Sequence, residues 1–146
     1  RETKWNGRLT IIHRDPLFIV DGAHNPAAAD MLEDSVRKYF KGRNMYFIMG
    51  VFRDKDYSYI IRKLCPYAEQ IVTIETPDNP RALPAQELAE AVRECNPHVQ
   101  AAENIQDAVN KVFAMADRED VILSFGSLSF IGEITTIVKN REEKNL

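Results

Sequence analysis

The sequence predicts an α/β domain in which a mostly parallel β-sheet is covered by helices on both faces. Short apolar runs alternate along the chain with segments of helical period, and this alternation is typical of βαβ units. The chain has 146 residues, of which 45% are hydrophobic, and this is enough for one domain with a buried core. The connections between parallel strands are expected to be right-handed.

The expected strands are short runs of apolar and β-branched residues. Residues 8–13 alternate as a half-exposed strand does, whereas residues 17–20 form a continuous apolar run that is typical of a buried strand. Because only a short break containing Pro16 separates them, these two strands are expected to pair as an antiparallel hairpin. Further strands are expected at residues 45–49, 70–74, 98–102 and 121–125.

The expected helices carry apolar residues at spacings of three and four. The first begins at Pro26, since a first helical turn tolerates proline, and it ends before Gly42. Similar patterns follow at residues 60–64, 84–95, 105–113 and 131–138. The polar residues 140–146 are expected to form a frayed tail.

Charge and composition exclude several classes of protein. The net charge of -3 arises from 19 basic and 22 acidic residues, so neither nucleic acid nor a membrane surface is expected as a partner. No apolar run approaches the roughly 20 residues that span a bilayer, and no signal peptide is visible. Cys65 and Cys95 match no metal-binding spacing. They are expected to be free thiols, which suits a cytoplasmic protein, and no metal site is expected in this chain.

Polar and glycine-rich turns follow several of the expected strands. They lie at residues 21–25, 50–56 and 126–127, and a turn-rich loop at residues 76–81 follows a fourth strand. The carboxyl ends of parallel strands share one edge of the sheet. We therefore expect these turns to converge there and to form the functional site.

Simpler interpretations of these polar residues remain open. Asp21 is equally consistent with a helix N-cap, Ser127 with a cap, His24 with packing, and Arg81 with a surface ion pair. Ser127, His24 and Asp21 are the residue types of a hydrolase triad, but the Gly-x-Ser-x-Gly motif is missing. Neither a phosphate-binding loop nor a dinucleotide fingerprint is present.

Five blocks of sequence stand out, in order: Trp-Asn-Gly-Arg at residues 5–8, Asp-Gly-Ala-His-Asn-Pro at 21–26, Gly-Val-Phe-Arg-Asp-Lys-Asp-Tyr at 50–57, Thr-Pro-Asp-Asn-Pro-Arg-Ala-Leu-Pro at 76–84 and Gly-Ser-Leu at 126–128. Together they closely resemble the C-terminal domain of folylpolyglutamate synthases. These enzymes belong to the Mur ligase superfamily and in bacteria often also act as dihydrofolate synthases. The chain departs from the family pattern at Asn6, where proline is frequent, and at Ser129, where an aromatic residue is frequent.

The resemblance implies a Rossmann-like, three-layer α/β/α domain with an antiparallel edge strand, spanning residues 1–146 as one domain of a larger two-domain ligase. An N-terminal ATPase domain would supply the phosphate-binding loop, the Mg²⁺ ligands and most of the folate site. ATP would phosphorylate a folate or dihydropteroate carboxylate, and the amine of L-glutamate would attack the acyl phosphate, leaving ADP and phosphate. The enzyme would be a monomer, and this domain alone would be inactive.

The resemblance also implies roles for four residues. Arg8 and Asp21 correspond to contacts with ATP, and His24 and Ser127 to groups that position the incoming glutamate. The first alternative is a Mur-type ligase of peptidoglycan precursors. Others are a non-catalytic nucleotide- or glutamate-binding module, and a hydrolase that would need Ser127 and His24 within hydrogen-bonding distance.

Overall fold

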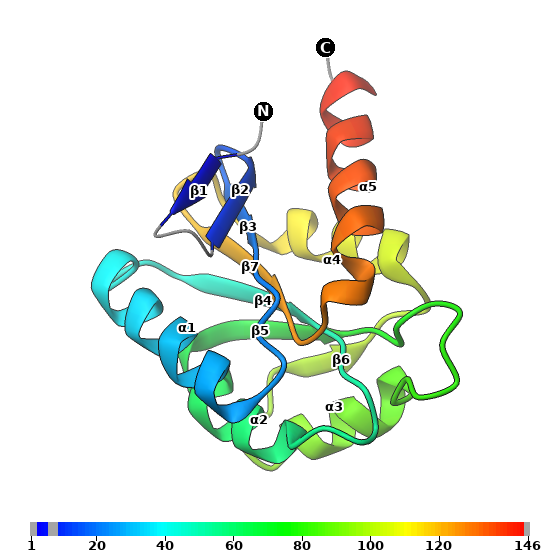
Figure 1. Cartoon of the computed structure of the whole chain (residues 1–146). Coiled ribbons are helices and arrows are strands. Elements are labelled where there is room, and N and C mark those ends of the chain that lie inside the picture. The colour runs from blue at the N-terminus through cyan, green and yellow to red at the C-terminus, as the bar shows by residue number, and fades with distance from the viewer. Residues whose placement is uncertain (1–2, 6–8, 145–146) are drawn as a thin grey trace.

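A seven-stranded sheet forms the centre of the molecule (Figure 1). The computed structural model describes residues 3–5 and 9–144. The strands lie in the spatial order β1-β2-β3-β7-β4-β5-β6. Their bounds are β1 Thr3–Trp5, β2 Leu9–His13, β3 Leu17–Val20, β4 Met45–Met49, β5 Ala68–Thr73, β6 Val99–Ala101 and β7 Val121–Phe125.

The sheet is parallel from β3 to β6 and antiparallel at its N-terminal side. Strand β2 pairs with β3 in antiparallel register, which confirms the predicted hairpin. Strand β1 pairs antiparallel with β2 and lies at this edge of the sheet, opposite the edge formed by β6. The sequence patterns did not reveal β1, because three residues are too few to show a period.

The described residues also form five α-helices and two short 3₁₀ turns; the last helix and the last 3₁₀ turn follow the final strand, and the others lie between strands. They are α1 Pro26–Tyr39, α2 Tyr57–Leu64, α3 Ala85–Arg93, α4 Ile105–Met115 and α5 Ile131–Lys144, with η1 at Cys65–Tyr67 and η2 at Leu128–Phe130.

Helix α5 is longer than the apolar pattern indicated. It continues through Lys144, although residues 140–144 were expected to belong to a frayed tail. The last turn contains Arg141 and Lys144, whose positive charges favour a helix C-terminus. The Arg141 guanidinium also lies 4.4 Å from the ring centroid of Phe113 on α4. Arg141 and Lys144 lie beyond the apolar stripe on which the prediction rested, so the pattern underestimated the length of the helix.

Helices cover both faces of the sheet and form two hydrophobic cores. Alternate residues of β3 face opposite sides: Leu17 and Ile19 pack in the core beneath α1, α2 and α3, whereas Phe18 and Val20 pack in the core beneath α4 and α5. This alternation is the period of two expected of a strand. The predicted three-layer, Rossmann-like α/β/α arrangement is therefore confirmed (Figure 1).

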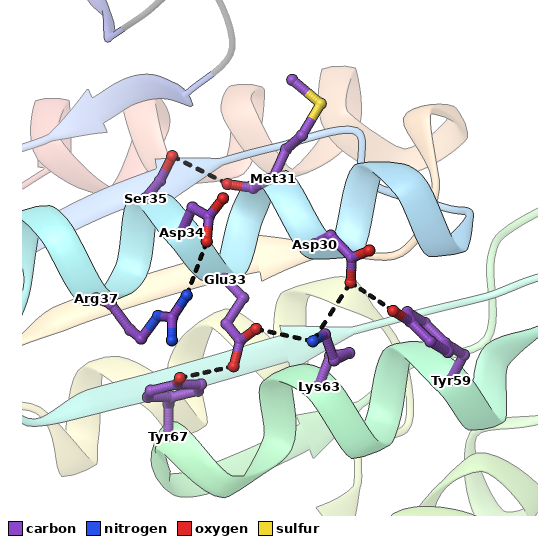
Figure 2. A network of polar contacts seen from close by, with 9 residues as sticks. All are labelled: Asp30, Met31, Glu33, Asp34, Ser35, Arg37, Tyr59, Lys63 and Tyr67. Atoms are coloured by element: carbon purple, nitrogen blue, oxygen red, sulfur yellow. Dashed lines mark hydrogen bonds and ion pairs between the residues drawn. The ribbon is translucent and has the colours of Figure 1, made fainter.

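A polar network ties α1 to α2 along their exposed sides (Figure 2). The Tyr59 hydroxyl donates to Asp30 at 2.5 Å, and the Tyr67 hydroxyl donates to Glu33 at 2.7 Å. The Lys63 ammonium lies 3.1 Å from Glu33 and 3.5 Å from Asp30. The Tyr67 hydrogen bond and the Lys63 charge hold the pKa of the Glu33 carboxyl below its ordinary value. The network fixes two helices whose N-termini follow polar turns of the sheet edge.

The expectation that the two cysteines are free thiols is confirmed. Both cysteines are free, and Cys65 is buried; burial raises the pKa of its thiol well above the ordinary value. Within the described part of the chain, no helix combines the length and apolar character needed to cross a membrane.

Candidate functional site at the carboxyl edge of the sheet

The polar turns predicted to converge do lie side by side at the carboxyl edge of the parallel strands. The Gly126 amide, after β7, donates to the Ala23 carbonyl after β3 at 2.9 Å. The Gly50 amide, after β4, donates to the Phe125 carbonyl at the end of β7 at 3.3 Å. These bonds join three turns that are far apart in sequence.

The loop after β5 joins the same edge. The Arg53 amide donates to the Arg81 carbonyl at 2.7 Å, and the Leu83 amide donates to the Val51 carbonyl at 3.1 Å. The predicted convergence of the fourth segment, residues 76–81, is thereby confirmed.

Gly126 makes the close approach of β7 and β4 possible. Its φ of +116° lies in a region that L side chains rarely adopt, and a Cβ at this position would collide with the Gly50 carbonyl oxygen. Glycine is therefore required at position 126 for steric reasons, because the two turns meet through backbone atoms.

The turn after β3 shows which residue caps helix α1, a question that the sequence left open for Asp21. Asn25 is the N-cap of α1, and its side-chain oxygen accepts from the Ala28 amide at 2.8 Å. The interpretation of Asp21 as the N-cap is therefore wrong. Asp21 Oδ1 instead accepts from the Ala23 amide at 2.8 Å, inside the turn, and the residue is 8% exposed.

His24 has a defined tautomer in this turn. Its Nδ1 lies 2.8 Å from the Gly22 carbonyl oxygen. A carbonyl can only accept, so Nδ1 carries a proton and donates it to this bond. The other ring nitrogen, Nε2, then accepts a hydrogen bond when the ring is neutral and donates one when the ring is protonated.

Ser127 is 2% exposed and follows Gly126 directly. Its Oγ accepts from the Ser129 amide at 3.1 Å and lies 2.8 Å from the Ser129 Oγ. In the described residues no hydrogen bond joins Ser127 to His24. The hydrolase alternative, which requires that bond, therefore gains no geometric support.

Two cavities open at this edge, and we name each after a residue that lines it. The His24 cavity has a volume of about 350 Å³ and is lined by His24, Phe52, Lys55, Arg81, Ser127, Leu128 and Ser129. The Asp21 cavity has a volume of about 590 Å³ and lies between the ends of β2 and β3 and helix α5; its lining includes Thr10, Asp21, Gly22, Leu128, Thr135, Thr136 and Lys139. Both volumes suit small-molecule groups.

Two basic side chains, Lys55 and Arg81, line the His24 cavity. Arg81 lies 4.7 Å from the Phe52 ring centroid and contacts both oxygens of Asp54, at 2.9 and 3.1 Å. That hydrogen bonding holds the pKa of the Asp54 carboxyl below its ordinary value, and the predicted surface pairing of Arg81 is confirmed. Lys55 lines the same cavity and makes no salt bridge within the described part of the chain.

The structure thus divides the predicted site residues between two cavities. His24 and Ser127 share one cavity, and Asp21 lines the other. Arg8 lies outside the described residues. The sequence analysis assigned no role to Lys55 or Leu128, although both lie in blocks that resemble the family, at residues 50–57 and 126–128. Within residues 3–5 and 9–144, no cluster of three or more His, Cys, Asp or Glu side chains could hold a metal ion.

A three-layer fold with cavities at the carboxyl edge of a mostly parallel sheet defines a Rossmann-like domain, and this edge is where such folds bind ligands. Residues 7–128 match the family model described as Mur ligase, glutamate ligase domain. The chain belongs to this family.

Within this family, the chain is similar to folylpolyglutamate synthases. The chain is 27% identical over 135 residues to a dihydrofolate synthase/folylpolyglutamate synthase from Buchnera aphidicola, a match that covers 92% of this chain and 31% of the relative. It is 28% identical to a solved Mycobacterium tuberculosis folylpolyglutamate synthase complexed with ADP and AMPPCP, with a TM-score of 0.75 over 96% of this chain and 32% of that one. It also shares the fold of E. coli FolC in complex with ADP, at 23% identity and a TM-score of 0.80 over 91% of this chain and 31% of that one. The chain therefore spans about a third of the length of these proteins.

Proposed function

We propose that this chain is the C-terminal domain of an ATP-dependent, ADP-forming ligase that adds L-glutamate to folate, with or without dihydrofolate synthase activity. The observation that carries the proposal is the convergence of the family's polar turns around two adjoining cavities, in a chain that belongs to the glutamate ligase domain family. The similarity to folylpolyglutamate synthases over most of the chain supports the substrate class.

The Asp21 cavity is the proposed nucleotide side. Asp21 is a nearly buried carboxylate that can accept from ribose hydroxyls, and Lys139 lines the same cavity with a positive charge. Arg8 would donate paired, charge-assisted hydrogen bonds to a phosphate. The ADP and AMPPCP complexes of the M. tuberculosis relative support a nucleotide in this family.

The His24 cavity is the proposed glutamate side. Lys55, which makes no salt bridge in the described part of the chain, would attract a glutamate carboxylate. Ser127 Oγ would donate a further hydrogen bond to it. With Nδ1 committed to Gly22, the neutral His24 ring would accept from the glutamate amine through Nε2. These groups would act by orienting the amine toward an acyl phosphate.

The remaining parts of the ligase would come from a partner domain of the same protein. This chain has no phosphate-binding loop, and it spans 31% of the Buchnera relative. We propose that an N-terminal ATPase domain supplies that loop, the Mg²⁺ ligands and most of the folate or dihydropteroate site. The complete enzyme would be a monomer, and the isolated C-terminal domain would form no amide.

Two substitutions in the full-length protein test the division of the site. Asp21→Asn should raise the KM for ATP, and His24→Ala should raise the KM for glutamate, each by about tenfold or more because a hydrogen bond to a charged group is lost. Asp34→Asn is the matched control, since the one ion pair of Asp34 among the described residues is an exposed one with Arg37 on α1.

Three results of these assays would contradict parts of the proposal. If wild-type protein ligates a peptidoglycan precursor and not a folate, the substrate class is wrong and the Mur-type alternative holds. If neither KM changes beyond that of Asp34→Asn, the assignments of Asp21 and His24 fail. If wild-type protein binds ATP and glutamate without forming an amide, the chain belongs to a non-catalytic binding module.

A further inference from the structure

Leu128 lies on the boundary between the two cavities. It begins η2 and lines both the Asp21 cavity and the His24 cavity. Its side chain is 66% exposed, whereas Phe130, two residues further on, is fully buried. A single exposed leucine is ordinary on a protein surface. The boundary position is what requires an explanation, because groups bound in the two cavities would meet beside this side chain.

The Leu128 side chain is held over the turn that joins Asp21 to His24. A Cβ added at Gly22 would collide with Leu128 Cδ2 and come within 2.9 Å of its Cγ. The φ of Gly22 lies outside the region that L side chains avoid, so the backbone would accept alanine. The leucine therefore occupies the space that a side chain at Gly22 would fill.

We infer that the side chain of Leu128 keeps water away from the acyl phosphate. The inference rests on the proposed function, in which phosphate arrives from the Asp21 side and the glutamate amine from the His24 side. The reacting acyl carbon must then lie where the two cavities meet. This junction is next to Leu128.

Two reactions compete at that carbon. In the productive one, the amine nitrogen forms a bond to the acyl carbon, the bond from that carbon to the phosphate oxygen breaks, and the amine proton is lost to solvent. In the wasteful one, a water oxygen forms the bond, and the same phosphate is released with the original carboxylate. The second reaction consumes ATP without making an amide.

The chemistry of the side chain suits exclusion of water. Asp21 and Ser127, on either side of the junction, can both hold water through hydrogen bonds. The isobutyl group of Leu128 offers no donor or acceptor, so it can neither bind nor orient a water molecule there. Exclusion of water from a reactive intermediate prevents its hydrolysis.

The test is the ratio of phosphate released to amide formed by the full-length protein. Leu128→Ala should raise this ratio about twofold or more above the wild-type value of about one. Leu128→Met keeps the apolar bulk and should retain the wild-type ratio. Gly22→Ala should displace the leucine and also raise the ratio, but it should add little in a Leu128→Ala background, because the two changes disturb one contact.

Met31→Ala is the matched control. Met31 is also a large, exposed apolar residue, at 49% exposure, but it lies on α1 and lines neither cavity (Figure 2). Its loss should leave the ratio at the wild-type value. An unchanged ratio in Leu128→Ala, including a result in which only a KM rises, would overturn the role of Leu128 and leave the proposed function intact. Failure of wild-type protein to form amide would instead contradict the proposed function.

Discussion

Replacing Gly126 with alanine tests whether the turns after β7 and β4 must meet through backbone atoms. Gly126 has a φ of +116°, and a Cβ there would collide with the Gly50 carbonyl oxygen and lie 3.1 Å from Val51 Cγ1. The substitution therefore introduces backbone strain and overlap together. Two other glycines separate these effects: Gly42 has a φ of +83° with nothing within 4 Å of its Cβ position, and Gly132 has free space without a positive φ.

The expected magnitudes follow from these surroundings. Strain at an unfavourable φ costs about 1–3 kcal/mol, and overpacking costs about 1–3 kcal/mol more. Gly126→Ala should therefore lower the free energy of unfolding by about 2–6 kcal/mol, a large share of the 5–15 kcal/mol typical of a domain. Gly42→Ala should lose about 1–2 kcal/mol from strain alone. Gly132→Ala, inside α5, should gain about 0.5–1 kcal/mol.

Urea unfolding of the chain, followed by far-ultraviolet circular dichroism, measures all three variants. The expected order of midpoints is Gly132→Ala, wild type, Gly42→Ala and then Gly126→Ala. Equal unfolding free energies for Gly126→Ala and Gly42→Ala would refute the reasoning. That result would show that the two turns can separate without loss, and that the close approach does not hold the site together.

Two further predictions concern polar side chains. Glu33→Gln should lower stability by about 1 kcal/mol near pH 7; because the folded pKa of Glu33 lies below its ordinary 4.5, this contribution is present above that pH and is lost as pH falls through the folded value. Urea unfolding at about pH 7 and pH 3 should show the difference closing in acid, and a constant difference would count against the network with Lys63 and Tyr67. Thr73→Val should lower stability by about 1–3 kcal/mol, because Thr73 Oγ1 donates to the Ala85 carbonyl at 2.7 Å. Thr76→Val should be neutral or stabilising in the same urea unfolding assay, because Thr76 Oγ1 is buried without a hydrogen-bond partner in the described part of the chain; equal losses for Thr73→Val and Thr76→Val would contradict this.

Local patterns predicted most of the elements because each is encoded by neighbouring residues. The hairpin of β2 and β3 follows from two apolar runs separated by a break at Pro16, and the start of α1 follows from Pro26. The same patterns missed β1, which is too short to show a period, and the last turn of α5, where charged side chains continue the helix beyond its apolar stripe.

The candidate site was only partly predictable. Its polar turns were visible because each follows an apolar run. The sequence left Asp21 open as the N-cap of the first helix, and only the structure assigns that cap to Asn25. Lys55 was only one polar residue of the turn at residues 50–56, and nothing in the sequence assigned it a role. It lines the His24 cavity because the loop after β4 folds back beside Ser127.

The sequence by itself determined which segments become strands and helices, and which polar turns follow the strands, because hydrophobic period and turn chemistry act over a few residues. Only the tertiary structure decided that β7 lies between β3 and β4. That order depends on pairing between segments about a hundred residues apart, which no local pattern encodes. It brings Gly126 against Gly50, places Leu128 over Gly22, and so makes two adjoining cavities from separate turns.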